Sequence, residues 1–226
     1  MQILCHVIDR DVHGNFCPVF SKMASSTNCD DLLHDSLKCA ASKLKIPGGK
    51  FKELQETAIR NVLAGEDLFI ALPTGFGKSA IYEAIPLCCD FLRERQYFDG
   101  AASASGTGYG GRWVTPTDDG ASRSTGSGTA INITIRSIVL VISPLISLMR
   151  SQVTLLQNLG INAAYVGDVS PGSVEDLELV NGRISVVYMS PESVLRKRGN
   201  DLVMNSTWQH NLCAVVVDES HCITKW

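Results

Sequence analysis

The stretch Leu72-Pro73-Thr74-Gly75-Phe76-Gly77-Lys78-Ser79 decides how the rest of the chain is interpreted. It follows an apolar run at 67–71, which predicts a buried strand, and it precedes the run 80–85, which predicts a helix. A Gly-rich turn in this context lets the backbone approach an anion, and the N-terminus of the next helix presents free N–H groups. The lysine can reach nucleotide phosphates and the serine hydroxyl can bind Mg²⁺. The stretch therefore predicts a phosphate-binding loop, with an ordinary Gly-rich turn as the alternative.

Composition restricts the class of protein. The chain has 226 residues, 45% of them hydrophobic, and a net charge of −3, which suits one buried core and gives no global basic field for nucleic-acid binding. Eight cysteines occur without any C-x-x-C pair, so neither a zinc site nor a disulfide framework is favoured. The N-terminus does not resemble a signal peptide and no apolar run has the length of a membrane span. We expect a soluble intracellular protein without membrane contact, nuclear in a eukaryote and otherwise cytoplasmic.

Strands and helices are expected to alternate along the chain. Strands are predicted at 67–71, 137–142, 162–166, 184–189 and 213–217, and helices at 30–44, 52–64, 80–93, 143–159, 174–180 and 190–198. The strands are continuous apolar runs, which favours an α/β fold whose parallel sheet carries helices on both faces. In such sheets functional residues gather beyond the carboxyl ends of the strands.

Two segments fall outside this alternation. Residues 1–28 are predicted to be an irregular N-terminal arm, leaving 29–226 as one domain around the predicted phosphate-binding loop. A segment at about 99–131 is rich in Gly and Ser and cannot bury enough surface to offset its ordering entropy. It is predicted to be a disordered insertion in a loop, with Trp113 exposed.

Asp218-Glu219 follows the last predicted strand and is the expected partner of a phosphate-binding loop. Asp218 is predicted to hold Mg²⁺, and Glu219 to orient and polarise the water that attacks the γ-phosphate. One carboxylate can face the metal ion and the other the attacking water only if the chain bends between Asp218 and Glu219.

Together, these residues resemble a known family. The tetrad Asp218-Glu219-Ser220-His221 resembles the DExH box of superfamily 2 helicases, and 73–79 resembles their first nucleotide motif, which commonly lacks the leading Gly that Leu72 replaces. Within that superfamily the chain is most similar to RecQ-type DNA helicases, over about residues 50–92 and 137–226. Four further stretches carry this similarity: Phe51-x-x-x-Gln55, Ser143 to Met149 with Gln152-Val153, Met189-Ser190-Pro191-Glu192, and Cys222-Ile223 with Trp226.

The resemblance implies a RecA-like P-loop fold and a role for each matched residue. ATP would be bound by Phe51, Gln55, Pro73, Thr74, Gly75, Phe76, Gly77, Lys78 and Ser79; Ser79 and Asp218 would hold Mg²⁺; Lys78, Asp218 and Glu219 would serve catalysis; His221 would couple ATP to DNA; and Ser143, Pro144, Ser190 and Trp226 would contact single-stranded or forked DNA. Alternatives from the residues themselves are a solvated helix-start Gln55, a structural His221, and plain helix caps at Ser143-Pro144 and Ser190. The basic run 196–198 would contact DNA or form a solvated helix end.

The implied function is ATP-dependent 3′–5′ DNA unwinding by the first of two motor domains. Because the sequence ends at Trp226, before any second RecA-like domain, we expect the isolated chain to bind ATP·Mg²⁺ weakly, to hydrolyse it poorly and not to unwind DNA. Two other hypotheses remain open: an RNA-directed DExH ATPase, and a non-catalytic remnant that binds nucleotide or a partner protein.

Overall fold

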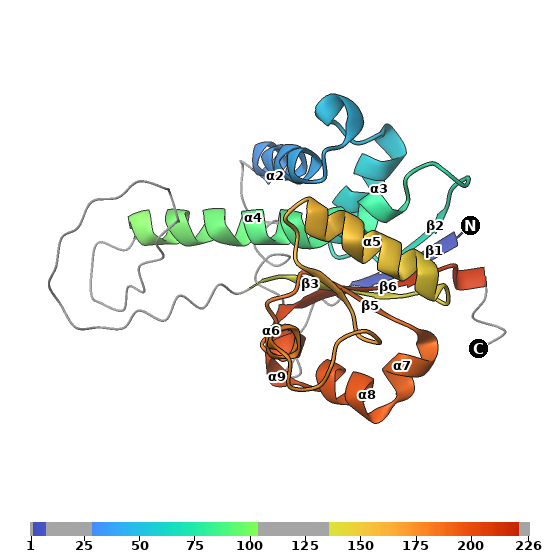
Figure 1. Cartoon of the computed structure of the whole chain (residues 1–226). Coiled ribbons are helices and arrows are strands. Elements are labelled where there is room, and N and C mark those ends of the chain that lie inside the picture. The colour runs from blue at the N-terminus through green and yellow to red at the C-terminus, as the bar shows by residue number, and fades with distance from the viewer. Residues whose placement is uncertain (1, 8–28, 104–135, 222–226) are drawn as a thin grey trace, which may run out of the picture.

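The computed structural model describes residues 2–7, 29–103 and 136–221, with no description of the side chains of 29 and 96–103. Its strands form one six-stranded sheet in the order β2-β1-β6-β3-β5-β4 (Figure 1). The bounds are β1 Gln2–Val7, β2 Leu68–Ala71, β3 Ile138–Ile142, β4 Ala163–Tyr165, β5 Val186–Met189 and β6 Leu212–Asp218. The disordered insertion predicted at about 99–131 was wrong for residues 99–103, which belong to a helix that ends at Ser103. The rest of the predicted insertion, with Trp113, lies outside the described residues.

Four strands, β6, β3, β5 and β4, are parallel to one another, as the apolar runs predicted. The sheet as a whole is mixed, because β1 lies between β2 and β6 and is antiparallel to both. Residues 2–7 are therefore not an irregular arm, and that part of the prediction was wrong; residues 8–28 lie outside the described residues. Ile3, Cys5 and Val7 are buried while Leu4 and His6 are exposed, which is the period-2 pattern of a half-buried strand.

Helices cover both faces of the sheet (Figure 1). One face carries α2 Cys29–Lys43, α3 Glu53–Leu63, α4 Ser79–Ser103 and α5 Ile146–Asn158, and the other carries α6 Val174–Val180, α7 Pro191–Leu195, α8 Lys197–Val203 and α9 Ser206–Asn211. A short 3₁₀ turn, Pro47–Gly49, joins α2 to α3. No helix in the described part of the chain is both long and apolar enough to cross a membrane. The predicted α/β fold with helices on two faces is confirmed.

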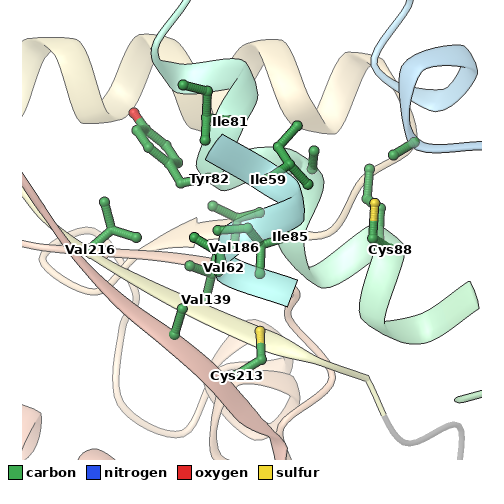
Figure 2. Packing of buried hydrophobic residues seen from close by; sticks show 14 of the residues in the cluster. Ile59, Val62, Ile81, Tyr82, Ile85, Cys88, Val139, Val186, Cys213 and Val216 are labelled. Atoms are coloured by element: carbon green, nitrogen blue, oxygen red, sulfur yellow. The ribbon is translucent and has the colours of Figure 1, made fainter. Parts of the chain in front are cut away.

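The two faces have separate hydrophobic cores because strand residues alternate between them. On the first face, Val139, Val186 and Val216 of the sheet pack against Ile59 and Ile85 of α3 and α4 (Figure 2). On the second face, the core is built from residues of β3, β5, α6, α8 and α9: Ile138, Leu140, Val187, Leu179, Leu202 and Trp208. The parallel strands are thus buried on both sides, which fixes the positions of their carboxyl ends.

β2, which leads into the phosphate loop, is less buried than the parallel strands. It is an edge strand in which only Ile70 is buried, while Phe69 is 60% exposed. The prediction of a fully buried strand at 67–71 was wrong in this respect. Leu4 of β1 pairs with Phe69, and both side chains are exposed, so no described residue covers the second face of the sheet over β1 and β2.

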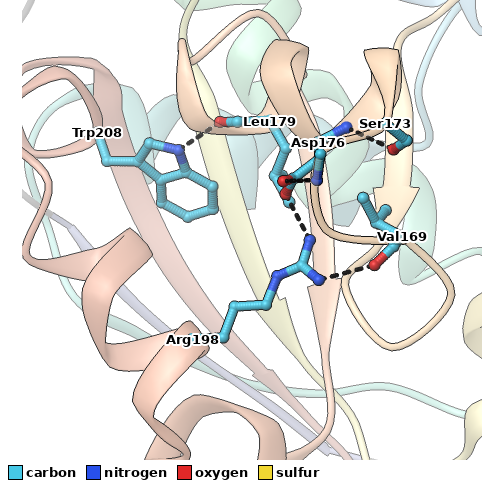
Figure 3. Close-up of polar contacts among 7 residues, drawn as sticks. Val169, Ser173, Asp176, Leu179, Arg198 and Trp208 are labelled. Atoms are coloured by element: carbon cyan, nitrogen blue, oxygen red, sulfur yellow. Dashed lines mark hydrogen bonds and ion pairs between the residues drawn. The ribbon is translucent and has the colours of Figure 1, made fainter.

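The helical segment predicted at 190–198 is two helices, because Arg196 has extended backbone angles between α7 and α8. Arg198 then turns inward: Nη2 lies 2.6 Å from Asp176 Oδ1 on α6, and Nη1 donates to the Val169 carbonyl at 2.7 Å (Figure 3). On the same face, the indole N–H of Trp208 donates to the Leu179 carbonyl at 2.7 Å. Arg198 thus joins α6 to α8 near the start of α8, so it is not a solvated helix end. Contact of the basic run with DNA stays a prediction.

Candidate nucleotide-binding and catalytic site

The predicted phosphate-binding loop connects β2 to α4, which begins at Ser79. Gly75 has φ 78° and Gly77 has φ 86°, a region of backbone conformation that residues with a Cβ rarely adopt. Pro73, Thr74, Gly75 and Gly77 are exposed, so the loop is accessible from solvent. The strand–turn–helix context that the motif requires is confirmed.

Lys78 is only 5% exposed, and its ammonium group faces back into the loop. Nζ donates to the carbonyl oxygens of Leu72 and Pro73, both at 2.9 Å. An ammonium has three donors, so Lys78 keeps one N–H for a phosphate oxygen, and contact with more phosphate oxygens requires exchange of the two carbonyl contacts.

Gln55 joins the start of α3 to the same loop. Its Nε2 donates to the carbonyls of Phe76 at 3.1 Å and Gly77 at 2.8 Å, while its Oε1 accepts from the N–H of Lys52 at 2.9 Å. Gln55 is 4% exposed, so the alternative of a solvated helix-start glutamine is excluded. Phe51 is also buried, at 7% exposure, and the Lys52 ammonium lies 4.4 Å from the centroid of the Phe76 ring.

The acidic pair Asp218-Glu219 lies at the carboxyl end of β6. Burial raises the pKa of the Asp218 carboxyl, and the positive charge of Lys78 opposes that rise. The influence of Lys78 reflects the closeness of the phosphate loop to the acidic pair across β1. Glu219 has φ 53°, and its N–H donates to Asp218 Oδ1 at 3.0 Å. This is the bend that the two-carboxylate prediction required, and it turns the Glu219 side chain away from the line of the strand.

His221 lies beside the acidic pair, with its Nδ1 3.2 Å from Glu219 Oε2. The imidazole is half exposed and the carboxylate is largely buried. His221 thus contacts the residue predicted to orient the attacking water; its predicted coupling role stays a prediction.

The residues predicted to line a DNA track divide into two cases. Ser190 is the N-cap of α7, because its Oγ accepts from the Ser193 N–H at 3.2 Å, with Pro191 at the first position. Ser143 is not a helix cap, because α5 begins at Ile146 with Leu145 as its N-cap. The prediction of a helix start at Ser143 and Pro144 was therefore wrong, while their contact with DNA stays a prediction. The Ser143 hydroxyl is buried without a hydrogen-bond partner, and Trp226 lies outside the described residues.

The structure adds four polar residues that the sequence did not single out as site residues: Gln152, Tyr82, Glu83 and Tyr188. Gln152 of α5 donates from Nε2 to Ser79 Oγ at 3.5 Å. Tyr82 and Glu83 follow Ser79 on α4, and Tyr188 of β5 donates from its hydroxyl to Glu83 Oε1 at 3.3 Å. The helical spacing of Tyr82 and Glu83 from Ser79 was visible in the sequence, but the contact with Tyr188 depends on the order of the strands.

The donor set at this edge suits Mg²⁺. A serine hydroxyl and a carboxylate are hard oxygen donors, and Mg²⁺ bound with a nucleotide takes only one or two protein ligands alongside phosphates and water. Within residues 2–7, 29–103 and 136–221 there is no cluster of three or more His, Cys, Asp or Glu side chains that would hold a metal ion by itself. Ser79 and Asp218 therefore fit Mg²⁺ that arrives with a nucleotide.

Comparison with known proteins identifies the family. The sequence pattern of the DEAD/DEAH box helicases matches residues 52–226, which include the phosphate loop and the acidic pair. The chain belongs to the DEAD/DEAH box helicase family. The α/β fold and the helicase motifs described above are those of this family's ATP-binding domain.

Relatives of this helicase chain carry RecQ-type names. It is 29% identical over 178 residues to the ATP-dependent helicase wrn-1 of Caenorhabditis elegans, covering 78% of this chain and 12% of that protein. It is 29% identical over 181 residues to the ATP-dependent DNA helicase RecQ of Haemophilus influenzae, covering 78% of this chain and 21% of that protein. Similarity to the ATP-dependent helicase SGS1 of Saccharomyces cerevisiae is 29% identity over 188 residues, 80% of this chain and 10% of that protein. The chain thus spans about a tenth to a fifth of these relatives, and the RecQ-type resemblance of the sequence is confirmed.

Proposed function

We propose that this chain is the ATP-binding motor domain of a RecQ-type DNA helicase, which binds ATP with Mg²⁺ and single-stranded DNA and hydrolyses ATP. The observation that carries the proposal is that the phosphate loop after β2 and the acidic pair after β6 leave the same edge of the sheet, separated by β1 alone. A phosphate loop and an acidic pair at the carboxyl ends of two strands of one sheet form the two halves of a nucleotide-hydrolysing site.

Each half has a distinct task in the proposed reaction. Lys78 would exchange its contacts with the Leu72 and Pro73 carbonyls for the β- and γ-phosphates of ATP. Ser79 and Asp218 would hold Mg²⁺, which neutralises charge on the phosphates when bound. Glu219 would accept a hydrogen bond from the attacking water, and its left-handed backbone conformation supports this role because it separates the two carboxylates.

Adenine selection is proposed for Gln55, with Phe51 supporting the pocket. The Gln55 amide has one donor group and one acceptor, which match the edge of adenine, and both contact backbone groups of Lys52, Phe76 and Gly77 in this structure. Adenine recognition would therefore be coupled to the conformation of the phosphate loop.

Single-stranded DNA is proposed to cross the carboxyl edge of the sheet near Ser143, Pro144 and Ser190, with Trp226 following the acidic box. Serine hydroxyls are among the groups that contact DNA phosphates, and Ser190 lies between the end of β5 and the start of α7. His221 would couple this surface to Glu219. Unwinding in the 3′–5′ direction is proposed for the chain joined to a second RecA-like motor domain, as the length of its relatives suggests.

ATP hydrolysis in the presence of nucleic acid tests the proposal. We expect slow ATPase activity that rises with single-stranded DNA and less with RNA of the same sequence, and that falls by at least about 100-fold in Glu219→Gln. Stimulation by RNA alone would favour an RNA-directed DExH ATPase. Nucleotide binding that is intact, with no hydrolysis in wild type under any condition, would favour the non-catalytic alternative.

A further inference from the structure

Gln152 joins helix α5 to the residue that follows the phosphate loop. Its Nε2 donates to Ser79 Oγ at 3.5 Å, a contact between residues that lie 73 positions apart in the sequence. α5 lies on the same face of the sheet as α4, whose first residue is Ser79 (Figure 1). The contact therefore places a carboxamide from a second helix beside the hydroxyl that is proposed to bind Mg²⁺.

Gln152 occupies a position on α5 that its neighbours fill with apolar side chains. Met149, Val153 and Leu156 form the stripe of α5 that packs on the first core, and Gln152 lies three residues after Met149 on the same stripe. An apolar side chain of similar length would continue this stripe without any polar atom to satisfy. Packing therefore does not explain a glutamine at this position.

The other half of the carboxamide has no hydrogen bond. Gln152 Oε1 is buried and has no partner among the described residues, although an amide oxygen can accept two hydrogen bonds. A buried acceptor that stays unpaired costs stability, so it is a candidate for binding a group that is not part of the fold. Ser143 and Ser220, which lie just beyond the end of β3 and the end of β6, also bury hydroxyls that have no partner in the described part of the chain. The carboxyl edge of the sheet thus holds three buried polar atoms that a ligand and its bound water could satisfy.

We propose that Gln152 supports the Mg²⁺ site from outside its ligands: Nε2 holds the Ser79 hydroxyl, and Oε1 accepts a hydrogen bond from a water molecule bound to Mg²⁺. Mg²⁺ that binds with a nucleotide keeps several water molecules, and their O–H groups match the unpaired acceptor. Gln152 is a positioning residue, because it acts on a ligand and a bound water and not on the nucleotide. The inference rests on the proposed function, since it requires Ser79 to bind Mg²⁺.

The test measures how much Mg²⁺ tightens nucleotide binding. A non-hydrolysable ATP analogue is titrated calorimetrically with Mg²⁺ and with EDTA, and the dissociation constant in EDTA divided by that in Mg²⁺ is the Mg²⁺ gain. In Gln152→Met, which keeps the length of the side chain and removes both polar atoms, we expect the gain to fall about tenfold, as is typical when a partner of a metal ligand is lost. The dissociation constant in EDTA should stay as in wild type, because Gln152 does not bind the nucleotide itself.

Gln157→Met is the matched control on the same helix. Gln157 Nε2 donates to the Ala163 carbonyl of β4 at 3.0 Å, and β4 is the edge strand opposite β2, so this substitution removes a bonded amide away from the phosphate loop. We expect its Mg²⁺ gain to equal that of wild type. Thermal unfolding adds a readout of opposite sign: Gln152→Met should be at least as stable as wild type, because it removes an unpaired buried oxygen, whereas Gln157→Met loses a hydrogen bond.

Gln152→Glu distinguishes an acceptor for metal-bound water from a donor to phosphate. The carboxylate keeps an acceptor at this position and has no N–H, so we expect the Mg²⁺ gain to be retained while the added negative charge weakens binding in EDTA. Gln152→Leu, which also removes both polar atoms, takes the place of Gln152→Met if that variant does not fold.

An unchanged Mg²⁺ gain in the folded apolar variant would overturn the role of Gln152 and leave the proposed nucleotide function intact. Affinity that falls equally with Mg²⁺ and with EDTA in that variant, or a gain that falls as far in Gln152→Glu, would overturn it as well. If wild type binds the analogue equally well with and without Mg²⁺, the proposed function itself is contradicted, which the wild-type titration alone reveals.

Discussion

At the scale of single residues, backbone conformation controls the site as much as side-chain chemistry does. Glu219 is a non-glycine residue with φ 53°, a conformation that costs free energy and that separates its carboxylate from that of Asp218. Gly77 has φ 86°, and a Cβ there would lie 2.7 Å from Gln55 Nε2, whereas a Cβ on Gly75 would meet no atom within 4 Å. The two glycines therefore have different tasks, although the sequence motif treats them alike.

This difference predicts unequal costs for two alanine substitutions. Both Gly75→Ala and Gly77→Ala pay for the left-handed backbone, but Gly77→Ala also displaces the Gln55 amide from the Phe76 and Gly77 carbonyls. We expect Gly77→Ala to lower the free energy of unfolding by about 1 kcal/mol more than Gly75→Ala. Urea denaturation of the two variants measures the difference, and equal costs would show that Gln55 does not stabilise the loop.

A second prediction at this scale concerns Glu83, whose pKa burial raises from 4.5 to about 7. Between these two values the native state binds more protons than the unfolded state, so stability is full below pH 4.5 and decreases as the pH rises to about 7. The decrease attributable to Glu83 is of order 3 kcal/mol, at 1.36 kcal/mol per pH unit. Glu83→Gln has no such proton, so its stability relative to wild type should rise across this range.

Denaturation midpoints of wild type and Glu83→Gln at pH 5 and pH 8 test this sign. A stability difference between the two proteins that stays constant with pH would contradict a raised pKa at Glu83.

At the scale of elements, β1 determines how the two halves of the site are spaced. It separates β2, which leads into the phosphate loop, from β6, which leads into the acidic pair, and its Ile3 pairs with both Ile70 and Asp218. Asp67 anchors the far end of this strand by accepting from the Val7 N–H at 2.8 Å and contacting His6. The Val7 hydrogen bond, followed by that of His6, lowers the pKa of Asp67.

Two substitutions in adjacent residues of β1 test whether this strand belongs to the sheet. Ile3 is 1% exposed and faces the core, while Leu4 is 37% exposed on the opposite face of the strand. We expect Ile3→Ala to cost about 2–4 kcal/mol of unfolding free energy and Leu4→Ala about 1 kcal/mol or less. Chemical denaturation measures both, and similar small costs would place residues 2–7 outside the folded sheet.

The basic run 196–198 supports a third comparison between neighbours. Arg198 bridges Asp176 and the Val169 carbonyl, whereas Arg196 is exposed. Because the ion pair is partly exposed, we expect Arg198→Ala to cost only about 1–2 kcal/mol and Arg196→Ala less than about 0.5 kcal/mol. Thermal denaturation distinguishes them; an Arg198→Ala variant as stable as Arg196→Ala would remove the structural role of Arg198.

How far the sequence predicted these elements depended on whether local or distant contacts determine them. The helix at 174–180 and the strands at 138–142 and 163–165 follow from apolar patterns within the segment and were predicted closely. The antiparallel strand at 2–7 was missed because its partners lie at 68–71 and 214–218, and a short alternating run does not reveal them. Ser143-Pro144 has the local pattern of a helix start, but α5 begins three residues later, since Ser143 is still buried at the end of β3.

At the scale of the whole molecule, the fold brings residues from four distant segments to one edge of a single sheet. Gln55, Lys78, Gln152 and Glu219 come from α3, the phosphate loop, α5 and the end of β6. The motif residues of this edge were predictable from the sequence, because their types and spacing determine their chemistry. Their supporting contacts, such as Gln152 with Ser79 and Tyr188 with Glu83, were not, because they depend on strand order and helix packing.

The central claim is that this edge binds ATP together with Mg²⁺ through Lys78, and equilibrium binding of ATP tests it most directly. Isothermal titration of wild type, Lys78→Ala and the control Lys197→Ala compares loss of the loop ammonium with loss of an exposed one on α8. We predict Mg²⁺-dependent binding by wild type and by Lys197→Ala, and an affinity at least about tenfold weaker in folded Lys78→Ala, as expected for loss of a hydrogen bond to a charged group. Equal affinity of Lys78→Ala and wild type, or no binding of ATP by wild type, would contradict the account.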